Sequence, residues 1–211
     1  MRDVTIRLAK PDECEEIQKI FNAPENGQYL GGFTQLEPIK SKQSAGSLAV
    51  AVEFDGTIVG ANEVSTKHDH RLQMQLVAVH PDYKQSKIAT ALYTYWAIKA
   101  ALNGRYMRTD TIIGDNPIMP QLLPTLGFKP GIVERGKVRR HHSLTQWVHS
   151  FLEDDPRFDR CPNDFKFEIE KTEKDDKNFA DVCVLLHKQG RMDDTLKLAE
   201  LREWVVEEFV G

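Results

Sequence analysis

The sequence predicts an α/β fold, with one mixed β-sheet flanked by helices and a mostly helical C-terminal extension. Strand-like runs alternate with segments of helical periodicity, which is typical of α/β domains. Of the 211 residues, 40% are hydrophobic, which is enough to bury a core. No apolar run approaches the ~20 residues that cross a bilayer, and the first residues lack the apolar stretch of a signal peptide. We therefore expect a cytoplasmic protein with no membrane partner.

The first part of the chain predicts a strand, a helix, a long loop and three strands in series. Residues 4–9 alternate like a strand, and Pro11 and Asp12 then open a helix. Residues 22–46 contain four glycines and two prolines and predict a loop, or a set of short helical turns, that could cover a substrate. Asp55-Gly56 between apolar runs predicts a hairpin of residues 47–53 and 58–65, and a third strand follows over 72–79.

The remaining elements follow in alternation. The periodicity predicts an amphipathic helix over 88–102, which Asn103-Gly104 ends. Further predicted elements are a strand over 108–113, a short helix over 116–126, a strand over 131–138, a helix over 144–152 and an edge strand over 165–169. Two last helices, separated by Gly190, predict an αα-hairpin.

The formal net charge of −4 is unevenly distributed along the chain. Residues 1–150 carry +3 and residues 151–211 carry −7, so the composition changes near Ser150. One concentrated basic tract consists of Arg135, Lys137, Arg139, Arg140, His141 and His142. The tract could receive an anionic substrate, such as a nucleic acid or an acidic peptide, or it could contact the acidic C-terminal region of the same chain.

Cysteine and histidine spacing predicts neither a disulfide framework nor a metal site. Cys14, Cys161 and Cys183 lie far apart and form no CxxC pair, which fits free thiols in a reducing compartment. His68 and His70 flank Asp69, but no third ligand is in sight, so we expect no bound metal.

The segment 76–92 combines a predicted strand, a tight polar loop and the start of a helix. Backbone N–H groups in the first turn of a helix have no intrahelical acceptor and favour an anion. Lys84 and Lys87 add positive charge at this point. The segment therefore predicts a phosphate site, although an ordinary strand-to-helix connection with solvated lysines would have the same pattern.

This segment resembles the central motif of the GNAT superfamily, the acetyl-CoA-dependent N-acetyltransferases. The motif is a strand ending in V-x-P-x-x-(Arg/Gln)-x-x-Gly-x-(Gly/Ala), and the lead-in matches at Val79-His80-Pro81-Asp82-Tyr83. Lys84 occupies the Arg/Gln position, Lys87 the first glycine and Ala89 the permitted Gly/Ala position.

A second resemblance to the same superfamily lies downstream. The family often shows Asn-x-x-Ala-x-x-Leu-Tyr-x-x-Leu-Gly-Phe, and residues 116–128 keep that spacing, with Met119 at the alanine and Leu123 at the tyrosine. The resemblance covers about residues 4–138. It implies a GNAT-like acyltransferase domain over residues 1–140, followed by an acidic, mostly helical extension over 141–211.

The resemblance implies acetyl transfer from acetyl-CoA to a primary amine, with the cofactor on the strand and the loop. The CoA pyrophosphate would lie on Gln85, Ser86, Lys87, Ile88, Ala89 and Thr90, and Lys84 would also bind the cofactor. The pantetheine arm would pair with the backbone of Val77, Ala78 and Val79 where two parallel strands splay, with Asn116 near the thiol. A bulge in that strand would direct an N–H at the thioester carbonyl and stabilise the oxyanion.

Two departures from the pattern bear on catalysis. Lys87 replaces a glycine, and we expect a right-handed helical backbone that tolerates a side chain there. Leu123 replaces the tyrosine that usually protonates the leaving thiolate. Either Tyr83, Tyr93 or a water substitutes, or the thiolate leaves unassisted, or the chain is not a catalyst.

Three carboxylates are candidate general bases, and three functions remain open. The carboxylates are Glu63, Asp110 and Asp115, each of which could equally be an exposed or paired strand-end group. The first function is N-acetylation of an unknown amine; the second is a GNAT-fold binding or assembly module with impaired catalysis. The third is acyl-type modification of a nucleobase, which rests on the basic tract 135–142. The sequence leaves the oligomeric state open.

Overall fold

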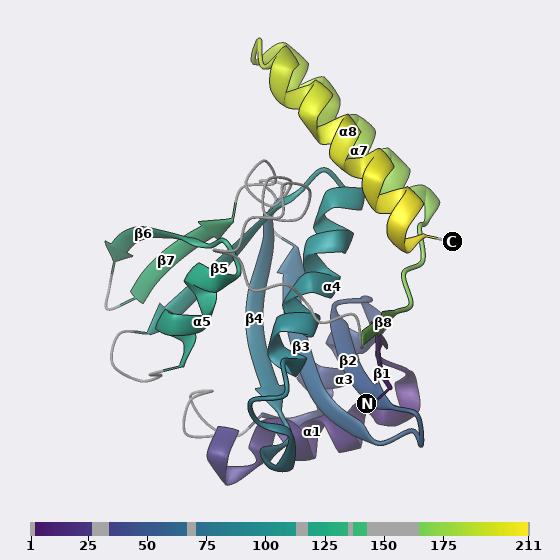
Figure 1. Ribbon diagram of the computed structural model, residues 1–211, viewed down its shortest axis with the longest axis vertical. Helices are drawn as coiled ribbons and strands as arrows, with labels where there is room; N and C mark the ends of the chain where they lie inside the picture. Colours follow the sequence, from purple (N-terminus) through teal and green to yellow (C-terminus); the bar gives the residue numbers. More distant parts are fainter. Residues whose placement is uncertain are drawn as a thin grey trace. The chain divides into compact units, whose positions relative to one another are not determined.

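The computed structural model describes residues 3–26, 34–66, 71–112, 118–134, 137–142 and 165–210 (Figure 1). The chain divides into two compact units. The first unit comprises residues 1–65, 74–95 and 161–168, and the second comprises 66–73, 96–160 and 169–211. The predicted α/β class with a mixed sheet and a helical C-terminal part is confirmed. No helix within the described ranges has the length and apolar character to cross a membrane.

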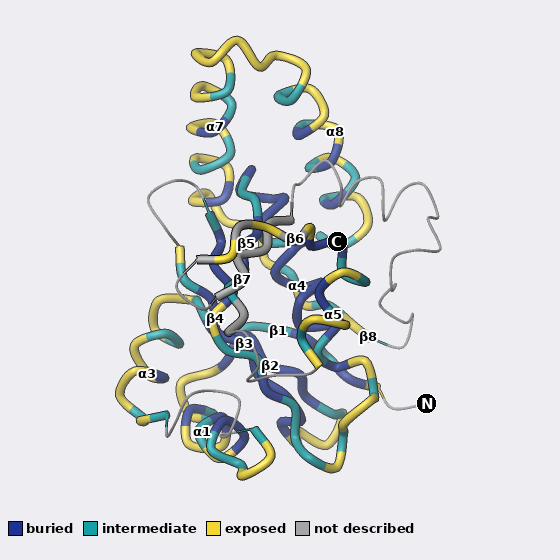
Figure 2. Tube along the Cα trace, turned by 90° about the vertical axis from the view of Figure 1, so that its left-hand side faces the viewer, coloured by how far each residue is buried: buried dark blue, intermediate teal, exposed yellow. Residues whose placement is uncertain are grey.

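The sheet of the first unit has the strand order β4-β3-β2-β1-β8. Its strands are β1 (Val4–Leu8), β2 (Leu48–Glu53), β3 (Ile58–Thr66), β4 (Arg71–Val79) and β8 (Phe165–Phe167). The β1–β2 and β2–β3 pairs are antiparallel and β1–β8 is parallel, so the sheet is mixed. Strands β2 and β3 are buried along most of their length (Figure 2). The strand predicted over 165–169 is confirmed, and it lies at the sheet edge beside β1.

The predicted β2–β3 hairpin is confirmed, and its turn follows from local chemistry. Gly56 has a φ of +92°, which glycine adopts without a steric cost. The Asp55 carboxylate accepts a hydrogen bond from the Thr57 N–H at 2.9 Å, and the Glu53 N–H donates to the Thr57 carbonyl at 2.9 Å. These bonds close the turn and fix the register of both strands.

The prediction of a loop or a set of short helical turns over residues 22–46 is wrong for its second half, where a regular helix of 9 residues, α3 (Leu36–Ser44), forms. After a short 3₁₀ turn at Pro11–Glu13, helix α1 (Cys14–Asn22) buries Ile17 and Phe21. Ile39 of α3 is fully buried in the same core cluster. The helix was not predicted because only one of its side chains, Ile39, is buried, so the sequence shows no apolar period. Its Pro38 also suggests a loop, although proline is tolerated in the first turn of a helix. Residues 27–33, the centre of the predicted lid, lie outside the described residues.

Helix α4 (Ile88–Leu102) is buried on every side, which corrects the prediction of an amphipathic helix. Every residue from position 90 to 98 is buried. The polar side chain of Thr94 is satisfied within the helix, because its hydroxyl donates to the Thr90 carbonyl at 3.0 Å. Gly104, with a φ of +67°, follows the predicted end of the helix.

The second unit contains three antiparallel strands in the order β6-β7-β5. Its elements are β5 (Tyr106–Ile112), α5 (Met119–Thr125), β6 (Lys129–Glu134), β7 (Lys137–His142), α7 (Glu173–Lys188) and α8 (Met192–Phe209). The single strand predicted over 131–138 is wrong, because β6 and β7 pair with each other instead. The sequence pattern of these two strands predicts them poorly, because neither alternates regularly between apolar and polar residues.

The C-terminal helices α7 and α8 confirm the predicted αα-hairpin, and Gly190 between them has a φ of +72°. The helix predicted over 144–152 lies outside the described residues. The domain boundary near residue 140 stays a prediction, although β8 places part of the proposed extension in the sheet of the first unit.

Candidate functional site

The connection from β4 to α4 is anchored at its start by side chains. The His80 imidazole Nδ1 accepts a hydrogen bond from the Asp82 N–H at 3.3 Å, and the Tyr83 N–H donates to the His80 carbonyl at 2.9 Å. The two rings meet edge to face with centroids 5.7 Å apart. The Tyr83 hydroxyl donates to Glu53 on β2 at 2.8 Å. These contacts hold the 3₁₀ turn η2 (Pro81–Tyr83) against the sheet of its own unit.

The next residues form a turn with unusual backbone angles. Gln85 has a φ of +64° and Lys87 a φ of +65°, both in the left-handed region that favours glycine. The expectation of a right-handed backbone at Lys87 is therefore wrong. Between them, the Ser86 hydroxyl donates to the Tyr83 carbonyl and ties the turn to η2. Non-glycine residues in this region cost about 1–3 kcal/mol each and persist at sites where the surrounding structure fixes them.

Helix α4 begins directly after this turn. The Ala91 N–H donates to the Lys87 carbonyl at 2.9 Å, which is the first intrahelical bond. The amides of Ile88, Ala89 and Thr90 therefore have no intrahelical acceptor. The side chains of Ile88 and Thr90 are buried, so the backbone is what this turn offers to a ligand. Successive N–H groups in such a turn form a concave site for anions.

The positive side chains predicted for this loop are exposed. Lys84, Gln85 and Lys87 are all solvent-exposed, so the Lys87 stem is not buried against the loop. Residues 84–87 thus form a turn that leads directly into the first helical residues, 88–90.

Replacing Lys87 with glycine is expected to raise the free energy of unfolding by about 1 kcal/mol, because glycine relieves the left-handed strain. Lys87→Ala keeps the Cβ atom and the strain, so this variant should be no more stable than the wild type. Urea denaturation of both variants measures the difference. Equal stabilities of the two variants would show that the turn is not strained.

The end of β4 presents alternate backbone groups to β3 and away from it. The His80 N–H donates to the Val59 carbonyl on β3 at 2.9 Å. Because successive peptides of a strand alternate, the Val79 N–H points away from β3. The Val79 carbonyl accepts from the Asn26 side-chain amide at 3.0 Å. Val77 and Val79 are half-buried and Ala78 is buried.

Gly60 on β3 is a site residue that sequence analysis missed. A Cβ atom at this position would lie 2.7 Å from the Ile88 Cγ2 and 3.3 Å from the Ala78 carbonyl oxygen. The glycine therefore lets the first turn of α4 pack directly on β3. The available signal was a glycine within a strand pattern, which often marks close backbone approach.

The two candidate bases that the structure describes are both ion-paired. Glu63 pairs with Lys42, with 2.9 Å between Oε1 and Nζ. Asp110 receives the Arg108 guanidinium through contacts of 3.1 Å to both carboxylate oxygens. Each carboxylate therefore has a structural partner within the chain. Asp115, the third candidate, and Asn116 lie outside the described residues.

The structure also shows where the candidate proton donors, Tyr83 and Tyr93, and the residue at the family's tyrosine position lie. Leu123, at the tyrosine position of the family pattern, is fully buried in α5. The Tyr83 hydroxyl is already bonded to Glu53, and Tyr93 is buried with 3% of its surface exposed. A side chain that protonates the leaving thiolate is therefore not evident among the described residues.

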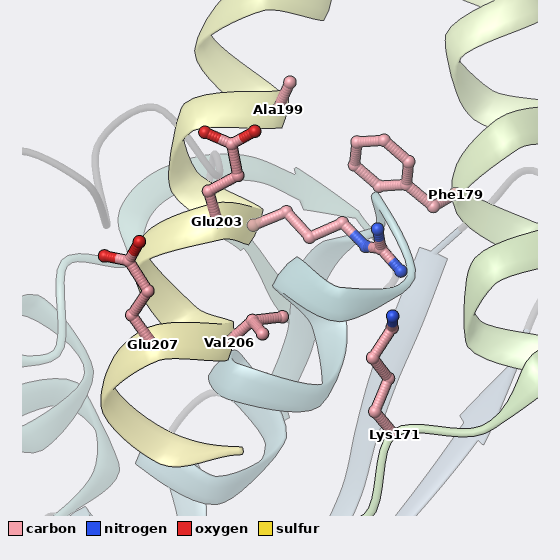
Figure 3. Close-up of a pocket in the computed structure, with 7 residues that line it drawn as sticks. Lys171, Phe179, Ala199, Glu203, Val206 and Glu207 are labelled. Carbon is pink, nitrogen blue, oxygen red and sulfur yellow. The ribbon is translucent and has the colours of Figure 1, made fainter. Parts of the chain in front are cut away.

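A pocket of about 310 Å³ in the second unit lies between α7 and α8 (Figure 3). Lys171 and Arg202 both bind Asp176, the lysine at 3.1 Å, and the Arg202 guanidinium lies 4.5 Å from the centre of the Phe179 ring. The positive groups of this pocket are thus neutralised within the chain. No group of three or more potential metal ligands occurs in the part of the chain that the structure describes.

Solved acetyltransferase structures share this fold. YncA from Salmonella typhimurium, solved with its cofactor acetyl-CoA, has a TM-score of 0.55 and 18% identity, over 67% of this chain and 94% of that chain. The PaiA N-acetyltransferase from Thermoplasma acidophilum, in complex with coenzyme A, has a TM-score of 0.54 and 16% identity, over 66% and 98%. An N-acetyltransferase from Staphylococcus aureus has a TM-score of 0.57 and 15% identity, over 67% and 98%. At these identities the matches show the fold alone.

Sequence comparison gives the family. No curated protein sequence matches this chain. A model of the acetyltransferase (GNAT) family matches residues 14–128, more than half of the chain, including β2 to α5 and the turn before α4. The chain therefore belongs to the GNAT acetyltransferase family.

Proposed function

We propose that this protein transfers the acetyl group of acetyl-CoA to a primary amine by direct attack in a ternary complex. The observation that carries the proposal is the strained turn before α4, in which Gln85 and Lys87 adopt left-handed angles. A backbone cost of this kind persists where a function requires the conformation. The turn leads into helix amides that suit a pyrophosphate.

In this proposal the backbone of two segments holds the cofactor. The amides of 85–90 bind the pyrophosphate, and the exposed ammonium groups of Lys84 and Lys87 add charge. The backbone of 77–79 pairs with the pantetheine arm. The related structures of YncA with acetyl-CoA and of PaiA with coenzyme A support this choice of ligand.

The reaction needs two proton transfers, one from the attacking amine and one to the leaving thiolate. The attacking amine must be neutral, and Glu63 and Asp110 are each held in an ion pair. We therefore assign proton removal to water rather than to either carboxylate. Leu123 cannot donate a proton, so the leaving thiolate is protonated by solvent, which slows turnover by about 10²–10⁴-fold relative to a positioned acid.

Acetyl-CoA is expected to stabilise the protein against heat. At a concentration 100 times its Kd, a ligand adds about 2.7 kcal/mol, which raises the melting temperature of a chain of this size by about 5–10 °C. The matched control is S-acetyl-N-acetylcysteamine, a thioester that lacks the pyrophosphate and should give no shift. An unchanged melting temperature at millimolar acetyl-CoA contradicts the proposal.

A second candidate function is a CoA-binding module that does not turn over. The buried Leu123 and the ion-paired carboxylates favour it. Release of free thiol from acetyl-CoA, measured with a panel of polyamines, amino-terminal peptides and lysine peptides, separates the two functions. Amine-dependent thiol release identifies an enzyme, whereas a thermal shift without release identifies the binding module.

A further inference from the structure

Asn62 is a fully buried polar residue of β3, and it precedes the ion-paired Glu63. Every residue of β3 from Ile58 to Val64 is buried, and Asn62 has no exposed surface. Its side-chain Nδ2 donates to the Leu76 carbonyl on the neighbouring strand β4 at 2.6 Å. Its Oδ1 accepts no hydrogen bond within the described structure.

The missing bond indicates that Asn62 does not serve stability alone. A buried acceptor without a partner costs stability, whereas an apolar side chain of the same shape would not incur that loss. Buried polar groups left partly unsatisfied are rare and require an explanation. The bond that Asn62 does make is to the backbone carbonyl of Leu76, the residue directly before the predicted pantetheine segment 77–79.

The geometry of one peptide connects this bond to the site. The Leu76 carbonyl and the Val77 N–H belong to the same planar trans peptide, in which C=O and N–H point in opposite directions. Because Asn62 draws the carbonyl toward β3, the Val77 N–H points away from β3. Because the donor is the Asn62 side chain, this peptide can be held in place independently of the backbone hydrogen bonds between β3 and β4.

We propose that Asn62 is a positioning residue that fixes the Leu76–Val77 peptide so that the Val77 N–H binds the thioester carbonyl of acetyl-CoA. The inference rests on the proposed function, because it needs acetyl-CoA beside β4. A donor fixed before the substrate arrives stabilises the charge that develops on the carbonyl oxygen during attack. Asn62 itself does not touch the substrate.

The test compares the affinities of acetyl-CoA and CoA by calorimetry, which needs no knowledge of the amine. CoA lacks the carbonyl, so the wild type should bind acetyl-CoA about three to ten times more tightly, the value of one hydrogen bond. Asn62→Leu should keep the affinity for CoA and lose this preference. The matched control Gln75→Leu removes a 3.0 Å side-chain bond to Ser65 between the same strands and should keep it.

The outcomes separate the two proposals. A wild type that binds neither ligand overturns the proposed function, and the role of Asn62 falls with it. A wild type that binds both, with an unchanged preference in Asn62→Leu, overturns the role of Asn62 alone. Equal wild-type affinities for the two ligands also overturn it.

A measurement on the wild type keeps the inference testable if Asn62→Leu does not fold. The Val77 amide proton should shift downfield in the NMR spectrum on addition of acetyl-CoA, and less on addition of CoA. Equal shifts with both ligands, or none, contradict the proposal.

Discussion

Replacing Asp175 with alanine is expected to lower the free energy of unfolding by about 3–5 kcal/mol, because it leaves the Lys99 ammonium, whose side chain is only 14% exposed, without its charged partner. Asp175 is 5% exposed. Its carboxylate accepts hydrogen bonds from the Thr172 N–H at 2.8 Å, from Lys99 at 3.1 Å and from Asn103 at 2.6 Å. It therefore joins the start of α7 to the end of α4 within the second unit. The melting temperature should fall by about 10 °C, measured by calorimetry.

The adjacent residue provides the matched control. Asp176 binds Arg202 and Lys171, but half of its side chain is exposed. Ion pairs at exposed positions contribute little because water screens them. Asp176→Ala should therefore melt close to the wild type. Equal losses in the two variants would show that burial does not strengthen the Asp175 network.

The Asp175 network also predicts a dependence of stability on pH. Burial raises the pKa of this carboxyl, but the hydrogen bonds from Thr172 and the charge of Lys99 outweigh it and hold the pKa below the ordinary value of 3.8. A carboxylate with a lowered pKa in the folded state stabilises the protein above its unfolded pKa and loses this effect as the pH falls. The difference in stability between the wild type and Asp175→Ala should therefore be largest near neutral pH and shrink below about pH 4.

The elements that sequence analysis predicted well are those that local chemistry determines. Asp55-Gly56 closes the β2–β3 hairpin, and Gly190 separates α7 from α8, because each turn uses backbone angles that glycine adopts. The two GNAT motifs placed the β4–α4 connection and α5 for the same reason: their spacing reflects a fixed strand–turn–helix geometry. These signals lie within a few residues of the structure they specify.

The elements that it missed depend on contacts between distant segments. Helix α3 has one fully buried side chain, Ile39, and its helical pattern becomes visible only once the core that receives it is known. Strands β6 and β7 stabilise each other through pairing rather than through apolar alternation. Helix α4 was predicted with its bounds, but its burial on all sides was not, because burial depends on the distant elements that pack around it.

The position of the β4–α4 connection was predicted from the sequence, but its conformation was not. The motif placed residues 84–90 at the loop, but spacing alone could not show the left-handed backbone of Lys87. It also could not show that Lys42 pairs with Glu63, because these residues lie on distant segments that meet only in the fold. The pair of Arg108 and Asp110 was a missed signal, since side chains two residues apart on a strand share one face. Asn62 gave no signal because an isolated asparagine in a strand has no distinctive pattern.

Replacing Gly60 with valine is expected to lower the free energy of unfolding by about 3 kcal/mol and to weaken CoA binding at least tenfold. The new Cβ would lie 2.7 Å from Ile88 Cγ2 and 3.3 Å from the Ala78 carbonyl, and neither a buried side chain nor a strand backbone can move away easily. The first turn of α4 must shift, and its amides are the proposed pyrophosphate ligands. Chemical denaturation and calorimetry with CoA measure the two effects.

Two further variants show whether the clash with Ile88 is the cause. Gly56→Ala introduces a Cβ with nothing within 4 Å at a φ of +92°, so it should lose stability through backbone strain alone and keep its CoA affinity. Ile88→Ala in the Gly60→Val background removes the contacted methyl group and should recover part of the lost affinity, which a double-mutant cycle expresses as a coupling between the two positions. Additive effects would mean that Gly60 does not position the helix. The amides of α4 would then owe their placement to the turn at residues 84–87 rather than to the packing beneath it.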